Sequence, residues 1–490
     1  MIRKSKGEKT ELSTVRSINQ SSTQKLGLTL GLLAAAQFLV VLDFSIVQIA
    51  LPTIRAELQI SLADLQWIIS AYGLTFAGFL LFSGRASDIY GRKALFVVGL
   101  VVFSLSSLAA GLATSEIVLI AARVVQGVGA ALASATGLAL IVRIFAPLGR
   151  LNQVLGIFTA VAATGFSAGV VLGGVLTETL GWRWIFFVNV PIGIVASLLA
   201  IRFLPDAGER VHSRLDLPGA ISVTGGLMLL VYALTKVGNG DVSYQTFLIL
   251  AFAAAVLGTF IAIEHRSATP LMPLGFLRRR TIFFANATAL LTFAAFVSMI
   301  FLLTTYLQLL RSYTPIYAAA ALLPGSLLYF SIGGFVAPRL VKKFGTRDVL
   351  VGSLVVFSIG LLLFTRFSLT SDYFTGILPA YLIACVGGAL SGTSANIAAL
   401  AGAKPGEEGI ASGLINTSRQ IGGPIGLAVT VSVIGLATVG VGVLAPSTEV
   451  ITAFGYAFAG AAAFAALAVV TSLFLRSSSA KSKTALGSKG

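Results

Sequence analysis

In the first half of this 490-residue chain, two ionisable side chains lie deep inside long apolar runs, and Asp43 is the first of them. It stands in the segment L-D-F-S-I-V-Q-I-A-L-P and is the only acid well inside any such run. Removing a carboxylate from water penalises its charged form, so a buried aspartate can hold either a proton or a cation. An antiporter needs that competition, and it requires Asp43 to reach a water-filled vestibule. The alternatives are a structural aspartate paired with a basic residue and one simply wetted by a cavity.

Arg123 is the second such side chain, in the run L-I-A-A-R-V-V-Q-G-V-G-A-A. Gln126 and Gly127 follow it at helical spacing, so the three residues share one face. A permanently charged guanidinium in a membrane helix must face protein or water. Arg123 could therefore assist the acid in proton transfer, or it could be a structural clasp. A dinucleotide-binding role for the glycines that follow is excluded, because no strand precedes them.

The elements that must position these side chains are membrane-spanning helices. The chain is 56% hydrophobic and 11% charged, with a mean hydropathy of +0.94, which is more apolar than a soluble domain. Each apolar run must satisfy its own backbone hydrogen bonds in lipid, so we predict an all-α membrane protein. The fourteen predicted spans cover about 26–50, 65–84, 94–114, 116–142, 152–177, 183–203, 217–237, 246–264, 281–307, 316–337, 348–367, 374–398, 409–438 and 452–475.

Composition excludes several classes of function. The net charge of +16 is scattered over short loops, which argues against a nucleic-acid-binding face. A single cysteine, Cys385, excludes a disulfide framework and a cysteine-ligated zinc site, and the two histidines have no acid or cysteine at ligand spacing. No nucleophile–base pair or metal set is present, so we expect neither an enzyme nor a metal or other cofactor. The first run is too long for a cleaved signal peptide and is predicted to be a retained helix.

Orientation follows from the distribution of lysine and arginine. With the N-terminus inside, 27 of them fall on the cytoplasmic side and five outside, while Arg123 and Arg419 lie within spans. This asymmetry predicts that both termini are cytoplasmic. The expected location is the bacterial cytoplasmic membrane, with the lipid bilayer as the protein's surroundings.

An internal repeat at an offset of 254 residues predicts two similar halves. The segment P-R-L-V-K-K-F-G-T-R, residues 338–347, can be laid over residues 84–93, so that Gly345 falls on Gly91. The same offset takes Gly169 to Gly423. We predict an N-terminal six-helix bundle at 26–204, two inserted helices at 217–264 and a C-terminal six-helix bundle at 281–475. The tails at 1–25 and 476–490 are predicted to be cytoplasmic.

The charged segment between the second and third spans has a specific pattern. It reads G-R-A-S-D-I-Y-G-R-K from Gly84 to Lys93, and it is predicted to be a hairpin loop. A positive-inside anchor would explain its basic residues, but not the aspartate at fixed spacing between two glycines. The pattern resembles the loop signature of the major facilitator superfamily.

Three further segments extend the resemblance. The Asp43 and Arg123 segments and the run G-W-R-W-I-F-F-V-N-V-P-I-G, residues 181–193, resemble the fourteen-helix drug:proton antiporter branch of that superfamily. The segment E-E-G-I-A-S-G-L-I-N-T-S-R-Q-I-G-G-P-I-G, residues 407–426, does so too, so the likeness covers about 26–475. The chain departs from the branch at Val170, where proline is usual, and at Gln48, where asparagine is common.

The resemblance implies roles for the residues that match. Asp43 would be the proton- or substrate-linked acid, and Arg123 would assist proton transfer. Gly84, Asp88, Gly91, Arg92 and Lys93 would form a cytoplasmic latch that stabilises the outward-facing state. Gly165, Gly169, Gly173 and Gly174 would form a glycine-lined contact called the antiporter seam, where spacing by four also favours close helix packing.

A second group of residues could line the substrate path. Asn416, Arg419 and Gln420 share one polar face, which could equally hydrogen-bond a neighbouring helix. Aromatic side chains could stack on a cationic ligand, although most membrane aromatics only pack. The predicted cavity-lining residues are Gln48, Trp67, Tyr72, Phe76, Gln126, Tyr306, Asn416, Arg419 and Gln420.

The function expected from this resemblance is proton-driven export of amphipathic drugs by alternating access, by a monomer. The tenth span carries no acid, so monovalent lipophilic cations or neutral drugs are expected rather than dications. A dedicated exporter of one metabolite, peptide or siderophore is the first alternative. A non-transporting membrane sensor is the second, although a sensor has no need of both Asp43 and Arg123 inside the bilayer.

Overall fold

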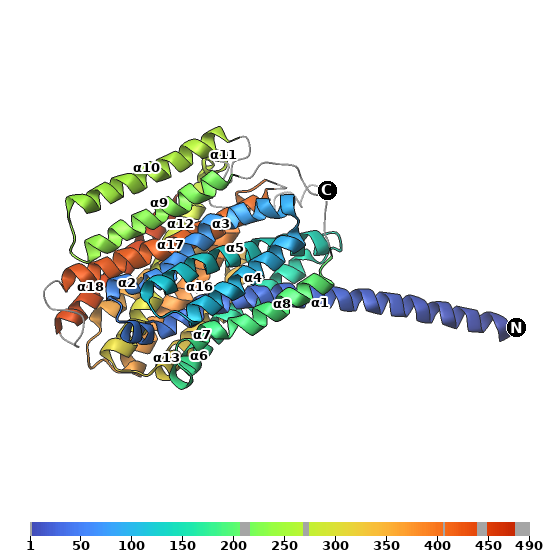
Figure 1. Cartoon of the computed structure of the whole chain (residues 1–490), viewed down its shortest axis with the longest axis horizontal. Helices are drawn as coiled ribbons and strands as arrows, with labels where there is room; N and C mark the ends of the chain where they lie inside the picture. The colour runs from blue at the N-terminus through green and yellow to red at the C-terminus, as the bar shows by residue number, and fades with distance from the viewer. Residues whose placement is uncertain (1, 206–215, 268–273, 405–406, 439–447, 476–490) are drawn as a thin grey trace.

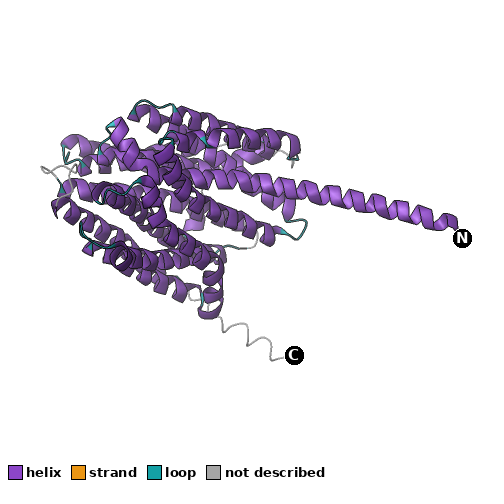
Figure 2. Cartoon of the chain, turned by 90° about the horizontal axis from the view of Figure 1, so that it is seen from below, coloured by secondary structure: helices purple, strands orange, loops and turns teal. Residues whose placement is uncertain are grey.

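The computed structural model describes residues 2–205, 216–267, 274–404, 407–438 and 448–475. These residues form helices joined by loops, with no strand in the part described (Figure 2). Fourteen helical stretches within them are long and apolar enough to cross a membrane, as the sequence predicted. The helices lie alongside one another in one body, from which the N-terminal part of the first helix projects (Figure 1).

The N-terminal bundle contains six spans. They are built from α1 (Ile2–Leu58), α2 (Leu62–Leu65) with α3 (Trp67–Tyr90), α4 (Arg92–Gly111), α5 (Glu116–Phe145), α6 (Leu151–Thr179), and α7 (Trp184–Phe187) with α8 (Asn189–Phe203). Helix α1 packs mainly against α6, and α5 packs against α3 and α4. The core of this bundle therefore brings α1, α3, α5 and α8 close together.

The C-terminal bundle repeats this arrangement. Its spans are α12 (Arg280–Thr305) with η1 (Tyr306–Leu310), α13 (Pro315–Ser331) with η2 (Ile332–Val336) and α14 (Ala337–Phe344), α15 (Thr346–Leu363) with η3 (Phe364–Arg366), η4 (Tyr373–Ile377) with α16 (Leu378–Ala401), α17 (Glu408–Ala437) and α18 (Thr448–Leu473). The short α11 (Leu274–Leu277) precedes it. Helix α12 packs on α17 as α1 packs on α6, and α15 packs on α16 as α4 packs on α5.

Two additional helices lie at one side of this body (Figure 1). Helix α9 (Leu217–Gly238) packs against α3 and α17, and α10 (Tyr244–Arg266) packs on α9. Only 17% of the most apolar window of α10 is buried, so this helix presents most of its surface to the surroundings. The pair therefore covers the join between the two bundles rather than contributing to either core.

The signature segment between α3 and α4 is more helical than expected. The sequence predicts a ten-residue loop, but α3 continues to Tyr90 and α4 begins at Arg92. Gly91 alone separates them, with a φ of +98° that side chains with a Cβ rarely adopt. At the equivalent position of the second half, Gly345 separates α14 from α15 with a φ of +90°. The repeat thus conserves the backbone break as well as the residue.

Glycines form the contact between α1 and α6. A Cβ built on Gly169 would lie 1.9 Å from Ser45 Oγ and 2.8 Å from the carbonyl oxygen of Leu42. Gly165 and Gly173 pack in the same way against the backbone of α1, at Phe38 and Ile46. Gly174 points the other way, toward the other bundle, where an added Cβ would lie 2.6 Å from Ala319 Cβ of α13. The predicted seam therefore serves two different contacts.

The two bundles meet most closely on the side predicted to face outward. There Gly174 packs on α13, Gln308 Nε2 donates to the carbonyl oxygen of Ile49 at 2.9 Å, and the Ile316 amide donates to Glu178. The opposite half of the α13–α14 span is more exposed, and the opposite half of α6 has fewer buried residues among those described. The side predicted to face outward is thus closed in this conformation.

We expect Gly169→Ala to destabilise the protein, because the new methyl group has no room between α6 and α1. Overpacking of this kind costs about 1–3 kcal/mol. The matched control is Gly156→Ala on the same helix, where an added Cβ meets nothing within 4 Å. That change should be neutral or stabilising by up to about 1 kcal/mol through helix propensity. Thermal unfolding in detergent measures both, and equal effects would show that the contact is not tight.

Candidate functional site

The predicted acid and arginine form a buried ion pair inside the N-terminal bundle. Arg123 Nη1 of α5 donates to Asp43 Oδ2 of α1 at 2.6 Å. Asp43 is 0% exposed and Arg123 is 1% exposed. In this conformation Asp43 therefore does not reach a water-filled vestibule, and the pair has the geometry of a structural clasp.

Two amides complete the hydrogen bonding of the carboxylate. Gln126 Nε2 donates to Asp43 Oδ1 at 2.9 Å, and Asn189 Nδ2 of α8 donates to the same oxygen at 2.8 Å. Asn189 also donates to Ser107 Oγ of α4 at 3.1 Å. Asn189 Oδ1 is buried and has no partner among the described residues. Asp43 thus accepts from a guanidinium and two amides, and the cluster links α1, α4, α5 and α8.

The guanidinium of Arg123 makes hydrogen bonds and a ring contact besides its ion pair with Asp43. Its Nε donates to the carbonyl oxygen of Ile68 at 2.9 Å, and its Nη1 also donates to Gln126 Oε1 at 2.8 Å. The ring of Tyr72 lies 4.2 Å from its central carbon, at a cation–π distance. Phe76 stacks on Tyr72 in turn, with ring centroids 6.1 Å apart. Arg123 therefore adds α3 to the helices tied by the cluster.

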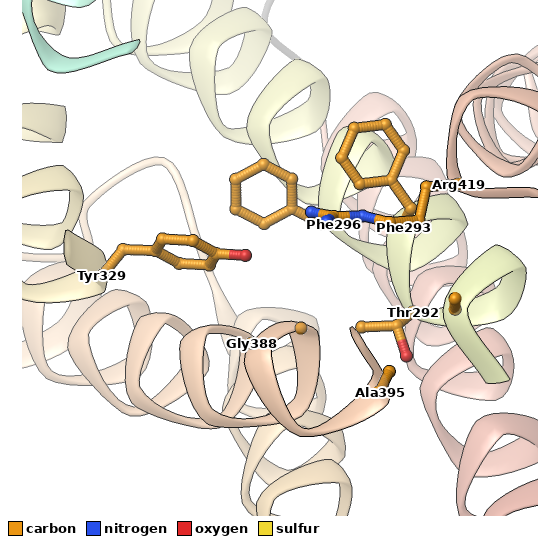
Figure 3. Close-up of a pocket in the computed structure, with 9 residues that line it drawn as sticks. Thr292, Phe293, Phe296, Tyr329, Gly388, Ala395 and Arg419 are labelled. Atoms are coloured by element: carbon orange, nitrogen blue, oxygen red, sulfur yellow. The ribbon is translucent and has the colours of Figure 1, made fainter. Parts of the chain in front are cut away.

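A small pocket lies in the C-terminal bundle, and of the predicted site residues only Arg419 lines it (Figure 3). About 290 Å³ of empty space lies between its walls when the open space at its mouth is counted, but a water-sized molecule can be centred in only about 10 Å³ of it. Its walls come from α12, α13, α16 and α17, and they include Phe293, Phe296, Tyr329 and Arg419. Arg419 lies 5.3 Å from the ring centroid of Phe293. In this conformation the pocket has room for about one water molecule, so binding of a larger ligand requires its walls to separate.

One residue, Phe44, connects the acid cluster of the N-terminal bundle to the pocket of the C-terminal bundle. Phe44 follows Asp43 on α1, and its ring stacks on Phe293 with centroids 6.2 Å apart. Phe166 of α6 contacts Phe296 at 6.0 Å. Side chains of the N-terminal bundle therefore reach the aromatic wall of the pocket, so a molecule bound there would touch residues that move with either bundle.

Of the predicted cavity residues, the structure brings only Arg419 to this pocket. Trp67 packs on Tyr232 of the inserted helix α9, and the hydroxyl of Tyr306 donates to the carbonyl oxygen of Ser368 at 2.6 Å. Gln48 is buried and its Nε2 donates weakly to the carbonyl oxygen of Phe44 at 3.5 Å.

The polar face of α17 divides in the same way. Asn416 is exposed, and Gln420 is partly buried beside Gly73 of α3. Of the three residues on that face, only Arg419 lines the pocket.

The signature segment contains a local ion pair. Arg92 Nη2 donates to Asp88 Oδ1 at 2.6 Å across one helical turn, around the break at Gly91. Asp88 is 44% exposed and Arg92 is 22% exposed, so the pair lies at the protein surface. A Cβ on Gly84 would meet nothing within 4 Å. Lys93 also has an interaction within the protein. In this state the acid of the predicted latch is bonded to its own segment.

Sequence reasoning missed Asn189 and Ser107 as members of the acid cluster. Asn189 lies in the run F-F-V-N-V-P, where an amide inside an apolar span is the available signal. Ser107 has no such signal, because serines in membrane helices commonly bond their own backbone. The aromatic wall at Phe293 and Phe296 is also invisible in sequence, since these residues look like ordinary membrane aromatics.

Comparison with known proteins identifies the family to which this chain belongs. The family model of the Major Facilitator Superfamily matches residues 33–427, and the chain belongs to that superfamily. It is therefore a membrane transporter and not an enzyme.

Several relatives are export and resistance proteins. The "Cephamycin export protein CmcT" of Amycolatopsis lactamdurans is 38% identical over 92% of this chain and 93% of the relative. The "Puromycin resistance protein pur8" of Streptomyces alboniger is 36% identical over 80% of this chain and 79% of its own length. The "Multidrug resistance protein Stp" of Mycobacterium tuberculosis is 34% identical, with 81% and 74% covered.

Solved structures show the same fold. The nucleoside transporter NupG has a TM-score of 0.64 at 12% identity, covering 92% of this chain and 98% of that chain. A bacterial homologue of the lysosomal transporter Spinster has a TM-score of 0.62 at 14% identity with the same coverage.

We expect Asp43→Asn to lower stability, because it leaves a buried guanidinium without a counter-charge. Breaking one partner of a buried pair costs about 3–5 kcal/mol. The double variant Asp43→Asn with Arg123→Gln should recover part of that loss. Glu57→Gln, which breaks the more exposed Glu57–Arg183 pair, is the control and should cost about 0–1 kcal/mol. Thermal unfolding compares them, and an Asp43→Asn variant as stable as Glu57→Gln would contradict the description of a clasp.

Proposed function

We propose that this protein exports amphipathic small molecules across the bacterial cytoplasmic membrane in exchange for protons, as a monomer with both termini in the cytoplasm. The observation that carries the proposal is an acid–base pair buried in one bundle and linked through Phe44 to a hollow in the other. The family and the named export proteins among its relatives support drug export. Proton coupling is the finer part of the proposal.

The acid cluster can serve both protonation states of Asp43. When the carboxylate is charged, Arg123, Gln126 and Asn189 all donate to it. When it is protonated, it becomes a donor, and an amide can rotate to present its oxygen instead. The unpartnered Oδ1 of Asn189 is such an acceptor. The cluster therefore holds an acceptor for the added proton, and the N–H groups of the rotated amide then need new partners.

Protonation of Asp43 would remove the counter-charge of Arg123, so it must accompany a rearrangement of the bundle. A buried charge without a partner is costly, which favours admission of water or a new partner for the guanidinium. In our proposal the state described here, closed on the outer side, holds Asp43 charged and sealed. Release of cargo and uptake of a proton belong to a second state in which the helices around Asp43 have shifted.

The glycine contacts give the bundles surfaces on which to move. Packing at Gly173 involves backbone atoms of α1, and packing at Gly174 involves α13. Small residues let helices approach closely without interlocking side chains. We propose that the α6–α13 contact opens when the outer side opens, while the α1–α6 contact keeps the N-terminal bundle together.

A dedicated exporter of one compound is the second candidate. Two relatives are named for cephamycin and puromycin, each a single compound, whereas a third is named for multidrug resistance. A dedicated exporter would use the same acid cluster and the same alternating access. The breadth of transported probes separates the two candidates.

Efflux of a panel of neutral, anionic and cationic amphipathic dyes from energised cells tests the main proposal. We expect efflux by the wild type that stops when a protonophore collapses the gradient. Asp43→Asn should reduce it at least tenfold while the protein still inserts in the membrane. Gln59→Ala, an exposed change at the end of α1, is the control and should retain efflux. Normal efflux by Asp43→Asn would remove Asp43 from the mechanism, and efflux unaffected by the protonophore would rule out proton coupling.

The latch gives a separate expectation. In the state described, Asp88 bonds to Arg92, and we propose that it exchanges this partner for one across the bundle interface when the cytoplasmic side closes. Asp88→Ala should then slow turnover several-fold and leave substrate binding unchanged. Single-turnover and steady-state transport in proteoliposomes distinguish these steps. Unchanged turnover would reduce the segment to a membrane anchor.

A further inference from the structure

The charge of Arg419 has no counterpart in the part of the chain that the structure describes. Its guanidinium carries five N–H donors, yet it makes no hydrogen bond or ion pair with another described residue. Its contact is the face of Phe293, 5.3 Å from the ring centroid. Arg123 of the other bundle, by contrast, donates to Asp43, Gln126 and the backbone.

No acid of the described chain forms an ion pair with Arg419. Asp43 already accepts from three donors in the N-terminal bundle. Position 297, which the repeat offset makes equivalent to Asp43, is a valine. In the C-terminal bundle the described acids stand at helix ends, as Asp372 does at the start of η4 and as Glu407 does in its ion pair with Arg279. The centre of the membrane body therefore carries an uncompensated positive charge at the pocket.

The pocket presents this charge together with a hydroxyl and aromatic walls. Figure 3 shows Arg419 entering from one side and the hydroxyl of Tyr329 pointing into the same space from the other. The Tyr329 hydroxyl has no hydrogen-bond partner among the described residues. Gly392 makes room for it, since an added Cβ would lie 3.2 Å from that oxygen. Phe293 and Phe296 supply apolar surface beside these donors.

A guanidinium, a hydroxyl and aromatic rings at one pocket favour an organic anion as the ligand. A guanidinium binds a carboxylate or a similar oxyanion through two parallel hydrogen bonds, and a hydroxyl can add a third. A cation would be repelled by Arg419, and a neutral molecule would leave the guanidinium unneutralised. Aromatic side chains beside the donors would hold the flat apolar body of the same ligand.

We propose that the pocket at Arg419 opens to bind amphipathic organic anions, with the anionic group on Arg419 and Tyr329 and the apolar body against Phe293 and Phe296. This inference deepens the proposed export function and rests on it. It differs from the lipophilic cations and neutral drugs that the resemblance implies. Neutralisation of Arg419 on binding and contact with Phe44 of the other bundle would let the bound anion influence how the two bundles pack.

Three probes with the same aromatic body and different charge test the proposal. They are 2-naphthylacetate, 2-naphthylethanol and 2-naphthylethyl-trimethylammonium. Their binding to the purified full-length protein in phosphatidylcholine nanodiscs is measured by isothermal titration calorimetry, with empty nanodiscs as the blank. We expect the anion to bind at least tenfold more tightly than the alcohol, and the cation to bind most weakly.

Variants assign the preference to Arg419. Arg419→Gln should abolish the advantage of the anion while leaving the alcohol's affinity unchanged, and Arg419→Lys should retain part of it. Arg339→Gln is the control, because that exposed arginine donates only to a backbone carbonyl of its own helix region. A preference that survives Arg419→Gln overturns the proposal, as does equal affinity for the three probes or binding of none.

A second arm separates a small-molecule anion from a lipid headgroup. Replacing part of the phosphatidylcholine with phosphatidylglycerol should leave the naphthylacetate affinity within about twofold. If phosphatidylglycerol lowers the affinity of both naphthylacetate and the alcohol, and Arg419→Gln restores only the affinity of the alcohol, the site binds a lipid headgroup and the proposal is overturned. These results do not depend on the gradient, so a failure here leaves proton-driven export standing, and a failure of efflux leaves the charge preference measurable.

Discussion

The ion pair between Asp43 and Arg123 is the interaction on which the rest of the N-terminal bundle depends. Neither charge would be tolerable alone in the membrane interior, and each is satisfied only because the other side chain and two amides are in place. The cluster draws on α1, α3, α4, α5 and α8, so its geometry and the packing of the bundle determine one another. A change in the protonation of Asp43 is therefore a change in what holds five helices together, which is the property a coupling residue needs.

The two bundles share a fold but use their charges differently. The N-terminal bundle encloses a matched pair, whereas the C-terminal bundle offers the unmatched Arg419 at a hollow. Glycine contacts permit the bundles to approach each other, and Phe44 and Phe166 bring the first bundle to the wall of that hollow. In our proposal the proton site lies in one bundle and the cargo site in the other, linked through Phe44, the residue after Asp43 on α1. Competition between proton and cargo would then act through helix packing rather than through one shared carboxylate.

Much of the fold and part of the site could be predicted from the sequence. Fourteen apolar runs, the repeat at an offset of 254 and the paired breaks at Gly91 and Gly345 follow from length, hydropathy and backbone sterics. The sequence shows that Asp43 and Arg123 lie inside membrane spans, but it does not show which side chain each of them pairs with. Asn189, Ser107 and the wall at Phe293 were missed, since an isolated amide, a serine and membrane aromatics have many ordinary roles. The helical continuation of the signature segment to Tyr90 is not predictable from its composition, because a charged segment between two apolar runs is typical of a loop.

The central claim is that Asp43 carries the proton that is exchanged for cargo. The most direct measurement follows the internal pH of proteoliposomes with a trapped pH-sensitive dye while a transported compound is added across an imposed proton gradient. The wild type should discharge the gradient in a substrate-dependent way, and Asp43→Asn should leave it intact although the protein is folded and binds the compound. Discharge by Asp43→Asn at the wild-type rate would contradict the account, and no substrate-dependent proton movement by the wild type would contradict it equally.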